Sequence, residues 1–415
     1  MQTTCRLYRA FWLLVFLLFA SRVHAYVIGP LDTASLLEQA PLSCRVKVLS
    51  VRSLKIASPQ IMIDGGYTLQ DGVATVAVSR VLKGICPQKL TIAVHTGETG
   101  EGATRLHVGE WAVVFLAPIK GQYASSVDSP EVRKAAEYVL LSPVNGTLEI
   151  PAPTKPSQGV ETEKNPQRRL LDELIQAADN KGASLPMLQR CIEQLGTWAV
   201  EYNRHLESEK PFAPAIRIAE EPRVAALLPH LHEKATDPIT YALYQTTALQ
   251  WGVLPTVKDA VCVLSHTPKQ PKGKLDFPVG NQPFTLSYVQ NNFVYTLRVR
   301  KRFGRADSFD DAAFCHAALQ TLAVQQDTEL REEVGAVMFN ARSTRNIPDA
   351  AHLLYDSSQD LRNTGVCLLR VLVEHTSEEK YSGGLSAEEY VKQEPDLLRH
   401  WKKWWEAQPK PYKAS

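Results

Sequence analysis

The sequence predicts a multidomain chain in which an all-β region precedes an all-α region. Three observations predict this order: apolar residues alternate with period two between Leu42 and Ile150, a polar and proline-rich stretch follows, and apolar residues then recur with helical spacing. The chain has 415 residues, 44% of them hydrophobic, which is long enough for two or three domains with sizeable cores. We therefore expect a small antiparallel β barrel followed by an α–α solenoid.

The predicted boundaries lie where the sequence pattern changes. We expect five parts, namely a cleaved signal peptide (1–25), a β-barrel domain (26–150), a flexible linker (151–168), a helical solenoid (169–385), and a C-terminal capping helix with its tail (386–415). The linker assignment rests on a stretch of proline, polar and charged residues with almost nothing apolar to bury.

The N-terminus has the pattern of a signal peptide. Arg6 and Arg9 precede an uncharged apolar run over 11–20, and Val23-His24-Ala25 supplies the small-x-small pattern of a cleavage site. The run has about half of the ~20 residues that a membrane-spanning helix needs. The sequence thus predicts cleavage after Ala25 and an exported mature chain, periplasmic or secreted, with no integral membrane segment.

Charge excludes one class of partner. The formal net charge is +2, and all three basic residues of the predicted signal would leave with it, so the mature chain would carry −1. A chain so close to neutrality is not drawn to nucleic acid by its overall charge.

Six cysteines remain after the predicted cleavage, and no CxxC motif occurs among them. This excludes the common zinc-ribbon and thioredoxin-type signatures. Cys44 and Cys86 both lie in the β region, so a disulfide between them is a candidate in an oxidising compartment. Two unpaired thiols are the equal alternative, because sequence alone does not choose among the pairings of six cysteines.

Six strands are expected in the β region. Their apolar residues alternate or run together over 44–48, 73–81, 90–94, 111–116, 138–141 and 147–150. Asn145-Gly146 lies between the last two, and this dipeptide is a strong hairpin signal.

Three short motifs in this region carry a resemblance to a known family. They are Arg80-Val81-Leu82-Lys83-Gly84, the 90–94 strand ending in His95-Thr96-Gly97, and Val108-Gly109-Glu110-Trp111 leading into the next strand. Residues 32–125 thereby resemble the netrin-like domain shared with tissue inhibitors of metalloproteinases, an OB-type barrel. Those inhibitors place an N-terminal cysteine, in a Cys-x-Cys opening, on the zinc of their target. Here the expected mature terminus is Tyr26 and the first cysteine is Cys44, which argues against that inhibitory mechanism.

After the linker the apolar spacing becomes helical. Leu185, Leu188, Ile192 and Leu195 lie on one face of a helix whose first turn contains Pro186. Similar runs predict that the second helices of successive pairs begin near residues 185, 238, 284, 328 and 359. The 284–303 stretch also alternates like a strand, but we expect a helix because each pair needs a partner to bury its apolar face.

The last pair carries a second resemblance. Ile347-Pro348 and Asp356 precede Leu361-Arg362 and Gly365, so two short helices have a proline at the first, an aspartate in the turn and an arginine opening the second. This resembles a HEAT repeat, and the looser runs over roughly 169–375 resemble a degenerate HEAT array with uneven spacing.

The C-terminal apolar residues also have helical spacing. They are Leu397, Leu398, Trp401, Trp404 and Trp405. We expect a capping helix that buries its tryptophans against the last repeat, in preference to an exposed aromatic site for sugars or partners.

The sequence offers little catalytic chemistry. The HExxH, GxSxG, P-loop and GxGxxG motifs are absent, so we expect no catalytic residues and no cofactor. His230, His232 and Glu233 are metal-ligand types, yet two histidines two residues apart point to different sides of a helix. We therefore expect no metal site there.

One cluster of cations could bind anions such as lipid head groups, acidic polysaccharide or an acidic partner. It comprises Arg298, Arg300, Lys301, Arg302 and Arg305. We favour a solvated helix end instead, because Asp307, Asp310 and Asp311 lie close enough in sequence to neutralise it.

These observations favour a non-enzymatic, exported scaffold that binds another protein through its solenoid surface. The first alternative is a metal-dependent or other enzyme whose site forms between barrel and solenoid. The weaker alternative is a protein that binds anionic lipid or polysaccharide through the cation cluster.

Overall fold

The fold is taken from a computed structural model, which describes residues 33–54, 70–96, 106–120, 127, 129–142, 146–153, 163–197, 221–266, 283–300, 308–325, 327–373 and 387–409. The predicted signal peptide and its cleavage site at Ala25 lie outside these residues. The described residues belong to one compact unit, Asp32–Ser415. Within them, no helix is both long enough and apolar enough to span a membrane.

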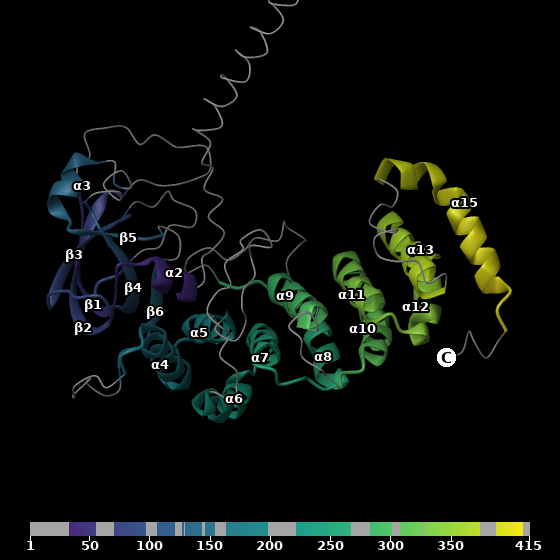
Figure 1. The fold of residues 1–415 in the computed structure, drawn as a ribbon, viewed down its shortest axis with the longest axis horizontal. Helices are drawn as coiled ribbons and strands as arrows, with labels where there is room; N and C mark the ends of the chain where they lie inside the picture. The colour runs from purple at the N-terminus through teal and green to yellow at the C-terminus, as the bar shows by residue number, and fades with distance from the viewer. Residues whose placement is uncertain are drawn as a thin grey trace, which may run out of the picture. The chain divides into compact units, whose positions relative to one another are not determined.

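Six β-strands form one sheet in the N-terminal part, and five of them close into a barrel (Figure 1). They are β1 (Leu42–Ser53), β2 (Gly72–Lys83), β3 (Lys89–Val94), β4 (Trp111–Pro118), β5 (Tyr138–Leu140) and β6 (Thr147–Ile150). The pairing order β1-β2-β3-β5-β4 is closed by antiparallel pairing of β4 with β1, which makes a five-stranded barrel with β6 as a further partner of β4. All six predicted strands are confirmed, and the barrel fits an OB-fold.

The barrel core follows from the period-two pattern. Cys44, Val46 and Val48 on β1 point inwards and are almost completely buried with Ala74 and Val76 of β2. Two short helices, α2 (Thr33–Gln39) and α3 (Pro130–Ala135), accompany the strands. The α3 helix packs on β2 and β3, and begins at the N-cap Ser129, whose side chain accepts a hydrogen bond from a backbone N–H.

Two strand pairings differ from expectation. β3 and β5 pair in parallel, so the barrel is mixed and not purely antiparallel. The predicted hairpin at Asn145-Gly146 is also wrong, because β5 and β6 both pair with β4. The Phe115 N–H donates to the Gly146 carbonyl and its C=O accepts from the Leu141 N–H. The N–H and C=O of one strand residue point to the same side of the strand. Because those of Phe115 bond to Gly146 and Leu141, β5 and β6 lie along the same edge of β4. Alternating apolar residues identify strands but not their neighbours.

The C-terminal part consists of helix pairs and fits an α solenoid (Figure 1). The first helices are α4 (Pro166–Asp179), α6 (Pro222–Lys234), α8 (Val257–Leu264), α10 (Asp311–Gln325) and α12 (Ile347–Leu353). The second helices are α5 (Leu185–Thr197), α7 (Pro238–Gln250), α9 (Leu286–Val299), α11 (Thr328–Ala341) and α13 (Gln359–Val373). A short 3-10 turn, η3 (Thr344–Asn346), precedes α12. The predicted starts of the second helices are confirmed, including the helix expected over 284–303.

The pairs stack through their second helices. Each of α5, α7, α9, α11 and α13 packs against the next, so these helices form a continuous layer, while α4 packs on α6 and α8 on α10 in the other layer.

Local signals fix several helix starts. Asn165 and Asp237 cap α4 and α7 with their side chains, each followed by a proline at the first helical position. The α4 helix begins at Pro166, inside the stretch expected as linker.

The C-terminal helix α15 (Ala387–Glu406) packs against α13 and α12. Trp401 and Trp405 are buried, with 2% and 5% of their surfaces exposed. Trp401 meets Trp404 edge to face with ring centroids 5.5 Å apart. The expected burial of the tryptophans in a cap is confirmed for Trp401 and Trp405.

Two glycines with positive φ provide a matched test of the barrel. Gly84 ends β2 with φ +82°, and a Cβ there would lie 2.6 Å from the Pro41 carbonyl oxygen. Gly109 precedes β4 with φ +90°, but its Cβ would meet nothing within 4 Å. Replacing Gly109 by alanine should cost only the left-handed backbone strain, about 1–2 kcal/mol. Gly84→Ala should lower the free energy of unfolding by more than Gly109→Ala does, because the added Cβ also clashes with the backbone. Urea denaturation of both variants measures the difference. Equal losses would contradict the close approach at Gly84.

Candidate functional site

A groove opens in the helical part between α6 and α8, with α7 as its floor. Its volume is about 540 Å³, within the ~300–1,000 Å³ range of ligand pockets. The lining residues come from three helices and the connection before α8: Ala225, Leu228, Pro229, His232, Glu233, Tyr244, Gln245, Ala248, Val253, Leu254, Pro255, Thr256 and Asp259. Two helices of the first-helix layer thus form its sides, and a second helix forms its floor.

The apolar wall comes from α6 and the connection. Leu228 in the wall and Ala248 in the floor are buried, whereas Val253 remains 39% exposed at the edge. Pro229 lies inside α6 and lacks the N–H that would bond the Ala225 carbonyl. Both residues line the groove, so a backbone acceptor lies beside it without its usual helical partner.

Aromatic rings gather at one side of the groove. The His232 ring lies 5.2 Å from the Tyr244 ring and 6.2 Å from the Tyr241 ring, centroid to centroid. His232 comes from α6 and the tyrosines from α7, so the pairing of these two helices creates the cluster. Aromatic faces of this kind attract apolar groups and cations.

Two carboxylates complete the lining. Glu233 is exposed at the end of α6, and Asp259 lies in the first turn of α8. Asp259 forms a capping box with Thr256, and its Oδ1 accepts a hydrogen bond from the Tyr241 hydroxyl at 3.3 Å. None of the described residues that line the groove is lysine or arginine. The groove is acidic.

The pKa values of two tyrosines are raised at this side of the groove. Burial, and then the charge of Asp259, raises the pKa of Tyr241 to about 12. The same two causes raise the pKa of Tyr244. The negative charge of Asp259 disfavours a phenolate beside it, and it would favour a positively charged ligand group bound there.

The three metal-ligand candidates lie on and beside the groove. The His230 side chain is 63% exposed and lies 4.0 Å from Glu233 at the edge of the groove, but His230 does not itself line the groove. His232 instead faces the groove. Among the described residues, no group of three histidine, cysteine or carboxylate side chains is arranged to hold a metal ion.

The cation cluster is only partly described. Arg298 pairs with Glu333 at 3.1 Å and lies over the Tyr295 ring. Arg300 is buried and pairs with Asp311 at 2.6 Å. Lys301, Arg302 and Arg305 lie outside the described residues. Both described cations of the cluster thus have carboxylate partners, whereas Asp310 pairs with Arg345 elsewhere.

Both candidate disulfide residues belong to the barrel. Cys44 is buried on β1, and Cys86 is half-buried in the connection after β2. Cys86 packs against the apolar cluster that contains Cys44, and both are free thiols in the structure.

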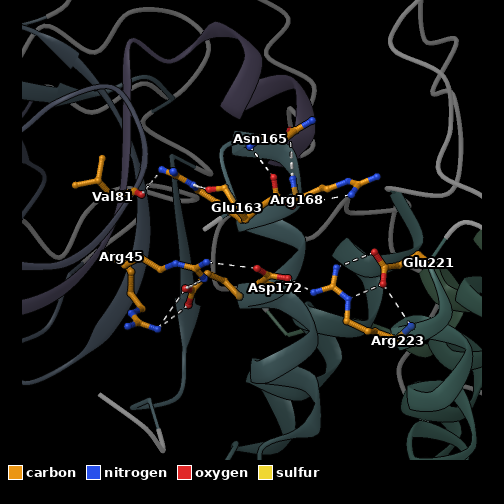
Figure 2. Close-up of polar contacts among 11 residues, drawn as sticks. Arg45, Val81, Glu163, Asn165, Arg168, Asp172, Glu221 and Arg223 are labelled. Carbon is orange, nitrogen blue, oxygen red and sulfur yellow. Dashed lines mark hydrogen bonds and ion pairs between the residues drawn. The ribbon is translucent and has the colours of Figure 1, made fainter. Parts of the chain in front are cut away.

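A second polar cluster joins the barrel to the first helices (Figure 2). Arg45 of β1 contacts Glu173 of α4 through Nη1 at 3.1 and 3.2 Å, and Arg80 of β2 reaches the same carboxylate at 2.7 Å. Asp172 pairs with Arg80 and with Arg223 of α6. Arg45 and Glu173 are 3% and 2% exposed, so this is a buried interface.

The space beside this interface is small. A cleft lined by Arg45, Glu173 and residues 150–153 has a volume of about 20 Å³, room for about one water molecule. A second cleft, between Glu149 and Phe284, holds about 30 Å³. The charged groups here neutralise one another and leave no ligand-sized cavity in either cleft.

Sequence reasoning missed both the groove and the buried interface. The period-two pattern places Arg45 on the outer face of β1, which is correct, but α4 covers that face. One signal was present: Asp172 and Glu173 interrupt an otherwise apolar run of Leu170, Leu171 and Leu174. Buried acids of this kind need cationic partners.

Comparisons with protein-family models, with curated proteins and with solved structures find no match to this chain. Its own topology shows a closed, mixed five-stranded barrel followed by a helical region. The geometry of the groove is therefore the basis for a functional assignment.

Proposed function

We propose that this chain is a non-enzymatic, exported protein-interaction scaffold, and that the groove between α6 and α8 binds a cationic segment of its partner. The observation that carries the proposal is the combination, in one ligand-sized groove, of aromatic rings, two carboxylates and no lining cation. The export part rests on the sequence pattern of residues 1–25.

The groove suits a lysine or arginine side chain better than an anion. Glu233 and Asp259 supply opposite charge, and His232 and Tyr244 supply ring faces on which a cation gains roughly 0.5–2 kcal/mol. The apolar wall at Leu228 and Val253 matches the methylene stem of such a side chain. An acidic ligand would meet like charge and no compensating donor from an arginine or lysine of the lining.

The surrounding architecture supports a protein as partner. Stacked helix pairs present extended surfaces that usually bind other chains. The two clefts near the barrel hold about 20 and 30 Å³, which supports the scaffold over an enzyme with its site in either cleft. The ion pairs of Arg298 and Arg300 likewise do not favour the anion-binding alternative.

We also propose that the helix pairs are degenerate HEAT repeats. In two turns an aspartate contacts the second helix of the preceding pair: Asp356 bonds Arg331 at 2.6 Å, and Asp237 lies 3.5 Å from Gln189. The repetition of this contact supports a common repeat unit.

The netrin-like relation of the barrel remains a proposal too, supported by its strand order and by the three short motifs.

The test measures peptide binding to the mature chain beginning at Tyr26. A fluorescein-labelled, extended alanine-lysine peptide and a matched alanine-glutamate peptide are titrated and followed by fluorescence anisotropy. The lysine peptide should bind and the glutamate peptide should not. Glu233→Gln should weaken binding about fivefold, because removing one nearby charge costs about 1 kcal/mol. Tyr244→Ala should weaken it by a similar factor.

Matched controls lie elsewhere on the helical part. Asp396 is 81% exposed on α15, and Tyr295 is 47% exposed on α9. Asp396→Asn and Tyr295→Ala should leave the affinity for the lysine peptide unchanged. Equal weakening by groove and control variants would show nonspecific charge attraction and contradict the groove as the site.

A further inference from the structure

The two cysteines of the barrel lie closer than their positions in the sequence require. Cys44 is on β1, next to a register shift between Ser43 and Cys44 in the ladder with β2. Cys86 follows the left-handed turn at Gly84, and the chain folds back at once, because the Val78 N–H donates to the Gln88 carbonyl at 2.8 Å. This return brings Cys86 onto the apolar cluster that holds Cys44.

Both thiols lie at the same apolar cluster of the barrel. The Cys44 thiol is placed to donate a hydrogen bond to the Cys86 sulfur, which lowers the pKa of Cys86 to about 7 and raises the pKa of Cys44 far above its usual range. Tyr138 of β5 packs on the same cluster, and the pKa of its phenol is raised by burial, then by the charge of Glu137, and lastly by the two cysteines.

We propose that Cys44 and Cys86 form a redox-active dithiol that closes to a disulfide by exchange with a disulfide donor. The assignment rests on the packing of both residues in one apolar cluster and on the return of the chain at Gln88, which brings Cys86 to it. It concerns the barrel and is independent of the proposed binding groove.

The exposure of the two thiols sets the order of the exchange. Cys86 is the more exposed, and as a thiolate it attacks one sulfur of the donor disulfide and expels the other as a thiolate, which takes up a proton from solvent. The Cys44 thiol then loses its proton to solvent and attacks the Cys86 sulfur of the mixed disulfide, expelling the second donor thiol. Two protein thiols are oxidised to one disulfide, and one donor disulfide is reduced to two thiols.

The experiment uses the whole mature chain, reduced, desalted and then incubated with oxidised glutathione. Peptide mapping without reduction should yield one linked pair containing Cys44 and Cys86. The Cys86→Ser variant should yield no linked pair and leave Cys44 unmodified, because Cys44 is buried. Cys262 is an exposed thiol on α8, so Cys262→Ser is the matched control and should retain the link.

A second readout guards against misfolding. Circular dichroism should show that Cys86→Ser remains folded, since this side chain is only half-buried. The oxidised chain should lose roughly 5 °C of Tm when a reductant is added, because the closed loop no longer restricts the unfolded state. The Cys86→Ser variant should show no such shift. A stable glutathione adduct at Cys86 with a free Cys44, or a link from Cys44 to another cysteine, would overturn the proposal.

Discussion

Replacement of Glu173 by glutamine should lower the free energy of unfolding by about 3–5 kcal/mol, because it removes the carboxylate that neutralises a buried arginine. Glu173 is 2% exposed and contacts Arg45, which is 3% exposed, and Arg80. Arg80 keeps Asp172 as a partner in the variant. Urea denaturation followed by circular dichroism measures the loss.

Two further variants separate charge from packing. The double variant Arg45→Met with Glu173→Leu removes both buried charges and should recover most of the lost stability, since apolar replacements of a buried pair are often neutral or better. Glu163→Gln removes the partner of Arg168 in an exposed pair 4.0 Å apart and should cost less than about 1 kcal/mol. If the double variant lost as much as the sum of its single changes, the ion pair would not be the cause.

Trp251→Ala should lower the free energy of unfolding by a similar amount, about 3–5 kcal/mol, because it leaves a large cavity in the helical part. Trp251 ends α7, is 1% exposed, and its Nε1–H donates to the Leu195 carbonyl of α5 at 2.9 Å. The indole thus joins two successive second helices by packing and by a hydrogen bond.

The phenylalanine variant distinguishes these two contributions. Trp251→Phe keeps most of the buried area and loses the hydrogen bond, so it should cost about 1–3 kcal/mol. Val324 is 87% exposed on α10, and Val324→Ala should change stability by less than about 0.5 kcal/mol. Guanidinium denaturation followed at 222 nm is suitable, because it does not depend on tryptophan fluorescence. Equal losses for the alanine and phenylalanine variants would show that packing of the indole contributes little.

The elements that sequence predicted well are those set by local chemistry. Asp237-Pro238 marks the start of α7 because the aspartate side chain caps the first N–H groups and proline needs none. The apolar faces of Leu188, Ile192 and Leu195 are buried as their spacing requires. These signals act within one turn of helix and need no knowledge of the neighbours.

The features that sequence did not reveal depend on partners distant in the chain. Period two identified the strands before and after Asn145, but not that both follow one edge of β4. The period-two pattern puts Arg45 on the outer face of β1, yet only the position of α4 makes it buried. The groove likewise arises because α6 and α8 line opposite sides of α7, and no residue spacing within one helix contains that information.

The stacking of second helices has a consequence for how the protein yields to force. Each helix of the row α5, α7, α9, α11 and α13 packs against the next second helix, and α15 packs on the final pair. Stability in such a row is close to a sum of nearest-neighbour terms, so it does not break all at once. Tension applied at the C-terminus would peel α15 and then one pair after another, while the barrel end holds through its buried ion pairs. Under tension the helical part would unfold in successive small steps, and the barrel end would unfold last.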